Sequence, residues 1–196
     1  MSTLLSILIC TVTGRVEKHL PLLVQEVQRQ VDEHPLFQIE ILYIGDNKKR
    51  SVGRKRNDLL KLAQGEYVCF LDDDDKISSV FISKTIPHLH SSTDIVCYMV
   101  ECSIDGGIGK PVYYNKDYVK NTNYADYYER MPNHLMLVKR ELALQTPFRD
   151  ISHGEDKDYS IRLKPLLQSQ ALIEEVLYYY IYNSSTTETQ RSNKPE

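Results

Sequence analysis

Four consecutive aspartates, Asp72 to Asp75, follow directly after an apolar segment at residues 67–71. Adjacent carboxylates repel one another, and a bound divalent cation removes that repulsion. In an extended segment Asp72 and Asp74 share one face, while Asp73 and Asp75 share the other. Two carboxylates on one face suit Mg²⁺ or Mn²⁺, particularly where substrate phosphates complete the coordination. The run therefore predicts a cation site; the alternative is a solvated acidic turn in which an aspartate caps the next helix.

The segments around this run alternate between strand-like and helix-like patterns. Continuous apolar runs predict strands that are buried on both faces, and apolar residues at helical spacing predict the helices between them. Such an alternation predicts a mostly parallel central sheet flanked by helices, which binds ligands outside the carboxyl ends of its strands. The polar loops 11–15, 45–50 and 72–76 are therefore expected to line one crevice. The predicted elements are strands at 4–10, 38–47 and 66–71, helices at 19–33 and 57–64, a basic loop at 48–57, and Gly65 as the end of the second helix.

The second half of the chain shows weaker patterns. We expect one domain over 1–183, made of the halves 1–102 and 103–183, and a polar, flexible tail at 184–196. The predicted elements of the second half are a strand at 93–102, an irregular or extended stretch with six tyrosines at 113–128, a helix at 139–145, a helix from 156 that Pro165 interrupts, and a strand pair or single strand at 171–183.

The composition is that of a soluble globular protein. The chain has 196 residues, of which 41% are hydrophobic and 26% are charged, and its formal net charge is -3. This balance creates no overall basic field, so we expect no stable nucleic-acid partner. The apolar runs are too short to span a membrane, and residues 4–10 lack the basic flank and cleavage site of a signal peptide. We therefore expect a cytoplasmic protein whose cysteines are reduced and mostly buried.

The segment 51–77, which contains the aspartates, resembles the family-2 glycosyltransferases of the GT-A fold. Their pattern runs from a glycine through Arg-Asn and Ala-x-Gly-Glu-Tyr to an apolar strand and Asp-x-Asp-Asp. Segments 6–15 and 39–47 resemble the first two strands of the family, although Cys10 stands where proline is usual and Gly45 where an acidic residue is usual. Segments 148–163 and 176–187 resemble its Glu-Asp motif and its closing strand. The positions of 51–77 that fit in register are Gly53, Arg56, Asn57, Ala63, Gly65, Glu66, Tyr67, Leu71, Asp72, Asp74 and Asp75.

The resemblance implies an α/β, Rossmann-like GT-A fold with a nucleotide-sugar donor at the carboxyl ends of the strands. It also implies that Asp74 ligates Mn²⁺ or Mg²⁺, while Asp72 contacts the ribose or supports the metal. Asp46 stands at the position that recognises the base, where its carboxylate suits the imide N–H of uracil and favours a UDP-sugar. The alternative for Asp46 is an ordinary turn residue. The complete set implied for the nucleotide sugar is Thr11, Thr13, Arg15, Asp46, Arg56, Asp72 and Asp73.

Glu155 and Asp156 precede a predicted helix, where acidic residues commonly stabilise the helix dipole. The resemblance instead implies that Asp156 is a general base that deprotonates the acceptor hydroxyl, while Glu155 orients the acceptor. A single base opposite a departing diphosphate gives one displacement with inversion. His134, His153 and Tyr124 are further candidates for acceptor contacts, although the histidines could equally be structural residues or metal ligands.

These observations predict a metal-dependent, inverting glycosyltransferase with a nucleotide-sugar donor and a sugar-bearing or other hydroxyl acceptor. Two alternatives remain open. A nucleotidyltransferase also uses paired aspartates, but it normally has a Gly-rich phosphate loop, and the turn at 11–15 has a single glycine. The other alternative is a non-catalytic module that binds sugar nucleotides or glycans. The presence of both Asp156 and the aspartate run argues against it.

Overall fold

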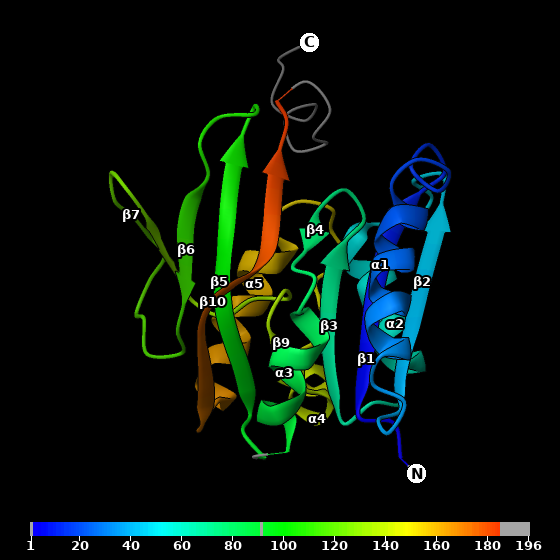
Figure 1. Ribbon diagram of the computed structural model, residues 1–196. Coiled ribbons are helices and arrows are strands. Elements are labelled where there is room, and N and C mark those ends of the chain that lie inside the picture. The colour runs from blue at the N-terminus through cyan, green and yellow to red at the C-terminus, as the bar shows by residue number, and fades with distance from the viewer. Residues whose placement is uncertain (1, 91, 185–196) are drawn as a thin grey trace.

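The described strands form one mixed sheet with helices on both faces (Figure 1). The structure is a computed structural model that describes residues 2–90 and 92–184. The strands are β1 (Leu5–Val12), β2 (Ile39–Asp46), β3 (Tyr67–Asp72), β4 (Lys76–Ile77), β5 (Ile95–Ile104), β6 (Lys110–Tyr114), β7 (Thr122–Asn123), β8 (Tyr128–Arg130), β9 (Leu137–Lys139) and β10 (Gln170–Tyr182). The helices are α1 (Leu20–Asp32), α2 (Val52–Leu62), α3 (Phe81–Leu89), α4 (Arg140–Gln145) and α5 (Glu155–Leu163).

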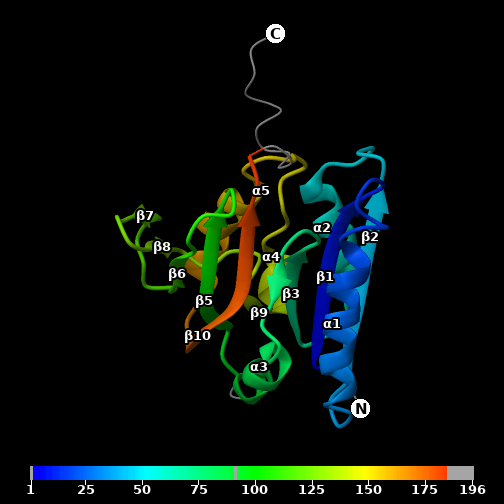
Figure 2. The ribbon, with the colours of Figure 1, turned by 45° about the horizontal axis from the view of Figure 1, so that its top comes forward.

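Parallel pairing organises the first half of the sheet, where β1 lies between β2 and β3. The apolar run that forms β1 is buried on both faces, as predicted. Its register places Cys10 beside Asp72 and Val12 beside Asp46, so the carboxyl ends of the three strands meet at one edge. β2 lies at one end of the sheet, and β7 lies at the other, beyond β6 and β8 (Figure 2).

The second half of the chain is interleaved with the first. β9 pairs antiparallel with both β3 and β5, and β10 pairs parallel with β5 and antiparallel with β4. Residues 171–183, predicted as a strand pair or a single strand, form one long strand with register shifts near Val176. The antiparallel pairs were not predicted, because β4 and β9 have two and three residues and are too short to show a period.

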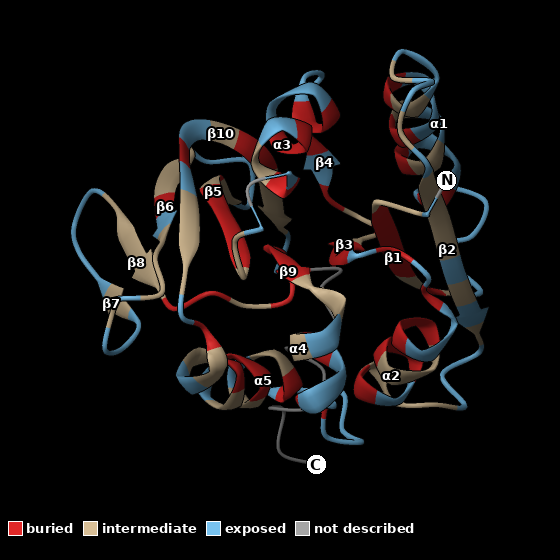
Figure 3. Cartoon of the chain, turned by 90° about the horizontal axis from the view of Figure 1, so that it is seen from below, coloured by how far each residue is buried: buried red, intermediate tan, exposed pale blue. Residues whose placement is uncertain are grey.

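Helices cover both faces of the sheet, which confirms the predicted α/β architecture. Viewed from below, α1 and α3 lie on one face, and α2, α4 and α5 lie on the other, with the buried strands between them (Figure 3). α5 gives way to a 3₁₀ turn over Lys164–Leu166, which confirms the predicted interruption at Pro165. None of the described helices is long and apolar enough to cross a membrane. The predicted tail, apart from Ser184, lies outside the described residues.

α2 begins earlier than predicted, so much of the expected basic loop is helical. Ser51 caps the helix, since its Oγ accepts the Arg54 N–H at 3.0 Å. Gly53 in the first turn donates its N–H to the Ile151 carbonyl at 3.0 Å, which brings α2 against the segment before α5. The helix ends at Leu62 and not at Gly65. Serine capping and the close approach at Gly53 therefore place Arg54, Lys55 and Arg56 in a helix instead of a loop.

Gly53→Ala is expected to lower the free energy of unfolding by about 1–3 kcal/mol, the usual cost of extra volume in a packed site. A Cβ atom at residue 53 would lie 1.9 Å from the carbonyl oxygen of Arg149, so one backbone segment has to move. Urea unfolding measures the difference. Gly14→Ala is the control, because a Cβ atom there has no neighbour within 4 Å. Equal losses in the two variants would contradict the packing explanation.

Candidate active site

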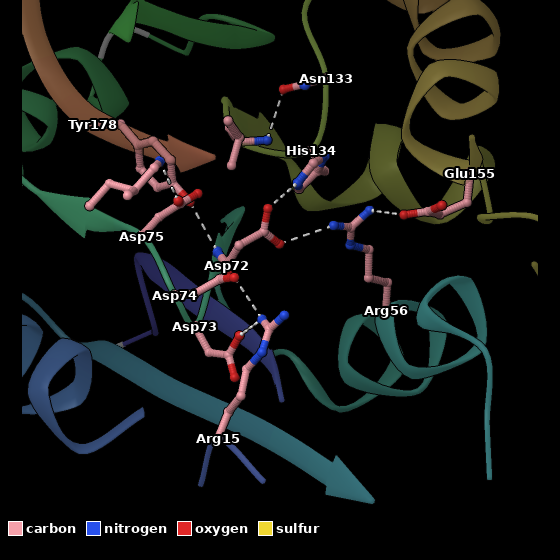
Figure 4. Close-up of polar contacts among 12 residues, drawn as sticks. Arg15, Arg56, Asp72, Asp73, Asp74, Asp75, Asn133, His134, Glu155 and Tyr178 are labelled. Carbon is pink, nitrogen blue, oxygen red and sulfur yellow. Dashed lines mark hydrogen bonds and ion pairs between the residues drawn. The ribbon is translucent and has the colours of Figure 1, made fainter. Parts of the chain in front are cut away.

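The aspartate run contains two partly exposed and two buried carboxylates (Figure 4). The side chains of Asp72 and Asp74 are 30% and 32% exposed, whereas Asp73 and Asp75 are 3% and 6% exposed. The exposed and buried pairs are those expected, but the segment is not extended: only Asp72 belongs to β3, and residues 73–75 form a turn in which the Asp75 N–H donates to the Asp72 carbonyl at 3.2 Å. All four residues line a cavity of about 170 Å³ at the carboxyl ends of β1 and β3. Asp72 and Asp74 are therefore the two carboxylates most accessible to a ligand.

Asp73 connects this turn to the turn that follows β1. Its carboxylate accepts hydrogen bonds from Thr11 Oγ1 at 2.5 Å and from Arg15 Nη1 at 2.7 Å. The same Arg15 nitrogen lies 2.9 Å from Asp74 Oδ2. Burial raises the pKa of Asp74, and Arg15 offsets part of that rise. The structure thus brings these four predicted residues together, with the Asp73 carboxylate holding Thr11 and Arg15 in place.

Asp75 connects the turn to β10, a contact that the sequence did not reveal. Its carboxylate accepts hydrogen bonds from the Tyr178 hydroxyl at 2.6 Å and from the Ile181 N–H at 2.8 Å. The Tyr178 hydroxyl also accepts the N–H of Asp72 at 3.1 Å. Burial and the charge of Asp72 raise the pKa of Asp75 to about 8. The alternative expectation of a helix cap is wrong for the next helix, since α3 has no side-chain cap.

Arg56 lies between carboxylates from two different elements and is 3% exposed. Its Nη1 lies 2.8 Å from Glu155 Oε1, and its Nη2 lies 3.2 Å from Asp72 Oδ1. The guanidinium carbon lies 5.8 Å and 5.4 Å from the ring centroids of Phe70 and Phe148. These contacts fix the separation of β3 and α5. In this structure Arg56 pairs with the carboxylates of Asp72 and Glu155. The predicted contact of Arg56 with a diphosphate, and that of Glu155 with an acceptor, therefore stay predictions.

His134 lies against the carboxylate of Asp72 and is 6% exposed. Its Nε2 lies 3.4 Å from Asp72 Oδ2, and its Nδ1 is buried without a hydrogen-bond partner among the described residues. Burial opposes ionisation of Asp72, but His134 and Arg56 together hold the pKa of that carboxyl well below its usual value. His134 also lines a second, larger cavity. It therefore adjoins a predicted metal ligand, and its contact with an acceptor stays a prediction.

Asp46 lies at the end of β2 beside a buried lysine. Its Oδ2 accepts hydrogen bonds from Arg50 N and Nε at 3.1 and 3.0 Å, and its Oδ1 lies 3.6 Å from Lys55 Nζ. Lys55 is 2% exposed and donates to the Thr11 carbonyl at 2.9 Å. The sequence predicted a basic loop at 48–57, but Lys55 is a buried residue of α2. A helix that begins at residue 52 places it one turn from the buried Leu59, a spacing that could have revealed it.

The larger cavity, of about 430 Å³, adjoins the smaller one. Asp156, in the first turn of α5, lines the larger cavity and not the smaller one, whereas Asp158 points elsewhere and pairs with Arg162 at 2.5 Å. Gly154 adopts φ 78°, a left-handed conformation that turns the chain into α5. The residues that line both cavities are Arg56, Asp72, Ser152, His153, Glu155 and Tyr180.

Three predicted site residues line neither cavity: Asp46, described above, Thr13 and Tyr124. Thr13 is exposed in the turn after β1, and its N–H donates to the Asp46 carbonyl at 3.0 Å. Tyr124 is 43% exposed and stacks on Tyr127 with ring centroids 4.5 Å apart. Tyr114 and Tyr128 line the larger cavity instead, from β6 and β8. The register of these short strands decides which tyrosines face the cavity, and the sequence did not reveal that register.

Asp72 and Asp74 fit a cation that is bound together with substrate phosphates. Both are hard oxygen donors, they lie two residues apart, and they line one cavity. In the described part of the chain, no three His, Cys, Asp or Glu side chains converge as a metal site. Mg²⁺ is commonly held by one or two carboxylates while waters and phosphates complete its coordination. The residues therefore suit a cation that arrives with a substrate, which stays a prediction.

Arg56→Met is expected to lower the free energy of unfolding by about 3–5 kcal/mol, because it leaves buried negative charge without its partner. Arg54→Met is the matched control on the same helix. The Arg54 side chain is 54% exposed and lies 3.4 Å from Asp58, and a surface ion pair of this kind contributes about 0–1 kcal/mol. Urea unfolding compares the two variants, and similar losses would show that Arg56 has no special structural importance.

Comparison with known proteins connects this site to a family. The sequence profile of glycosyl transferase family 2 matches residues 7–145. No curated protein matches the chain. The structure is similar to that of S. aureus TarS 1-349 in complex with UDP-GlcNAc, with a TM-score of 0.67 and 15% sequence identity over 98% of this chain and 62% of that chain. The complex of the same protein with UDP gives a TM-score of 0.63 and 15% identity over 91% of this chain and 60% of that chain.

At this level of identity the structural likeness shows the fold, and it confirms the predicted GT-A architecture. The chain spans about three fifths of the length of these TarS chains. The profile match, by contrast, covers more than half of the present sequence and includes most of β1, the aspartate run and β9. On this match, the chain belongs to glycosyl transferase family 2.

Proposed function

We propose that the protein is a divalent-cation-dependent, inverting glycosyltransferase that moves a sugar from a UDP-sugar to an acceptor hydroxyl. The observation that carries the proposal is the junction of two cavities, one at the aspartate run and one at Asp156, along a shared wall. That wall includes Asp72, Arg56 and Glu155. A hydroxyl held in the larger cavity could therefore reach the anomeric carbon of a donor bound in the smaller one. Membership of glycosyl transferase family 2 supports the reaction class.

The smaller cavity suits the nucleotide diphosphate. Thr11 and Arg15 lie beside the aspartates. Asp46 lies at the end of the neighbouring strand, outside the lining of this cavity; its Oδ1 lies 3.6 Å from Lys55 Nζ and has no hydrogen-bond partner among the described residues. Asp72 and Asp74 would hold Mg²⁺ or Mn²⁺ against the diphosphate. A cation bound there offsets negative charge on the leaving group. The UDP and UDP-GlcNAc complexes of TarS support a UDP-sugar as the donor class.

The larger cavity suits the acceptor and its base. Asp156 lines it, and its carboxylate would remove the proton of an acceptor hydroxyl. The hydroxyl oxygen then forms a bond to the anomeric carbon, while the bond from that carbon to the diphosphate oxygen breaks. The proton ends on Asp156, and the electron pair leaves with UDP. One displacement of this kind inverts the anomeric centre.

Asp74→Asn is expected to weaken binding of UDP in the presence of Mn²⁺ by at least about tenfold, or 1.4 kcal/mol. The reason is the loss of one of two anionic oxygen ligands. Calorimetric titration with Mn²⁺ and then with EDTA measures this change, and wild type in EDTA should bind as weakly as the variant. Asp126→Asn, an exposed change outside both cavities, is the control. UDP binding that EDTA leaves unchanged would remove the metal from the proposal.

Asp156→Asn is expected to reduce kcat by about 10²–10⁴-fold, the usual contribution of a general base. UDP release from UDP-GlcNAc, with water or an added hydroxyl acceptor, measures the rate. The Kd for UDP should change little, because Asp156 does not line the smaller cavity. Asp158→Asn, two residues further along α5, is the control. A wild-type protein that binds the donor but never releases UDP would instead be a sugar-nucleotide-binding module.

A further inference from the structure

We propose that the acceptor carries an anionic group, a phosphate or a carboxylate, and that Arg130 binds this group in the larger cavity. The inference rests on the proposed function, because it takes that cavity as the acceptor site. Arg130 is the last residue of β8 and lines the cavity. No recognisable motif marks Arg130 in the sequence, where it follows the tyrosine-rich stretch at 113–128.

The guanidinium of Arg130 is held in position by neutral groups. Its Nη1 donates to the carbonyl oxygens of Thr122 at 3.0 Å and Glu129 at 2.9 Å, and its Nη2 donates to Asn123 Oδ1 at 2.8 Å. Its carbon lies 4.9 Å from the ring centroid of Tyr128. No carboxylate among the described residues forms an ion pair with it. The positive charge is therefore fixed by the protein but not neutralised by it.

Two donors of this guanidinium remain for a ligand. An arginine side chain has five N–H donors, and within the described part of the chain the hydrogen bonds of Arg130 are the three to Thr122, Glu129 and Asn123. Paired N–H donors of a planar guanidinium match the two oxygens of a carboxylate or a phosphate. A neutral sugar would offer hydroxyls to the same donors and leave the charge without a partner. The geometry thus favours an anion over a neutral hydroxyl.

The proposed base and this cation act on the same part of the cavity. Burial raises the pKa of Tyr114 above its usual value, Arg130 counteracts part of that rise, and Asp156 adds to it. Tyr114, Arg130 and Asp156 all line this cavity, and both charges act on the Tyr114 hydroxyl. Apart from residues shared with the smaller cavity, the charged groups of the lining are the cations Arg130 and Lys157 and the carboxylate of Asp156. An acceptor that presents a hydroxyl to Asp156 can thus place an anionic group at Arg130.

The test compares three sugars of similar size: glucose 6-phosphate, glucuronate and glucose. Each is titrated by calorimetry into the full chain, with saturating UDP and Mn²⁺ present so that the smaller cavity is filled. We expect at least one charged sugar to bind about tenfold or more tightly than glucose, a difference of 1.4 kcal/mol. Arg130→Gln should reduce this preference to about twofold or less, and Arg130→Lys, which keeps the charge, should retain part of it. Arg149→Gln is the control, because Arg149 is 66% exposed and lines neither cavity.

Preference for the phosphate or for the carboxylate identifies the source of the anion. Equal affinities for charged and neutral sugars, an unchanged preference in Arg130→Gln, or no binding of either charged sugar overturns the inference. Titration with UDP alone separates this result from the proposed function. If UDP binds but no preference for charged sugars is found, the inference alone fails. If UDP does not bind but the Arg130-dependent preference is present, the anion site stands and the proposed donor fails.

Discussion

The burial of one guanidinium, that of Arg56, is the interaction on which the site depends. A buried cation loses its hydration, and only close carboxylates and ring faces can offset that loss. Arg56 on α2 has both, with Asp72 from the end of β3 and Glu155 from the start of α5. Glu155 lies 99 residues further along the chain than Arg56. The two cavities consequently have a common wall that neither half of the sequence could build alone.

The aspartate run shows how four adjacent carboxylates are accommodated. A turn at the end of β3 buries Asp73 and Asp75 and leaves Asp72 and Asp74 partly exposed. Each inward group is satisfied by donors from other elements, Asp73 by the end of β1 and the turn after it, and Asp75 by β10. The inward pair thereby anchors the backbone that carries the outward pair. A cation between Asp72 and Asp74 would then encounter ligands whose positions are already fixed, which reduces the entropic cost of binding.

Periodicity and composition were enough to predict the parallel strands, their order in the chain and the meeting of their carboxyl ends. The pairing of Asp72 with Asp74 matches the expected alternation, although a turn at residues 73–75, and not an extended segment, produces it. Contacts between distant segments were not predictable in this way. Tyr178 lies 106 residues beyond the Asp72 N–H that it accepts, and no local pattern in β10 signals this partner. Lys55 was misplaced for a different reason, because the start of α2 depends on a single serine cap and a single glycine contact.

The interleaving of β9 and β10 with the first half of the sheet has a consequence for biosynthesis. A ribosome releases the chain from its N-terminus, so β1, β2 and β3 emerge well before their later partners. Until residues 178 and 181 have been made, the Asp75 carboxylate lacks one or both of its donors, and β5 lacks the complete strand that pairs along its whole length. A nascent chain thus carries the aspartate run for roughly a hundred residues of synthesis before the fold can hold it in place. Competence to bind a ligand at this turn is acquired only when almost the whole described chain has been translated.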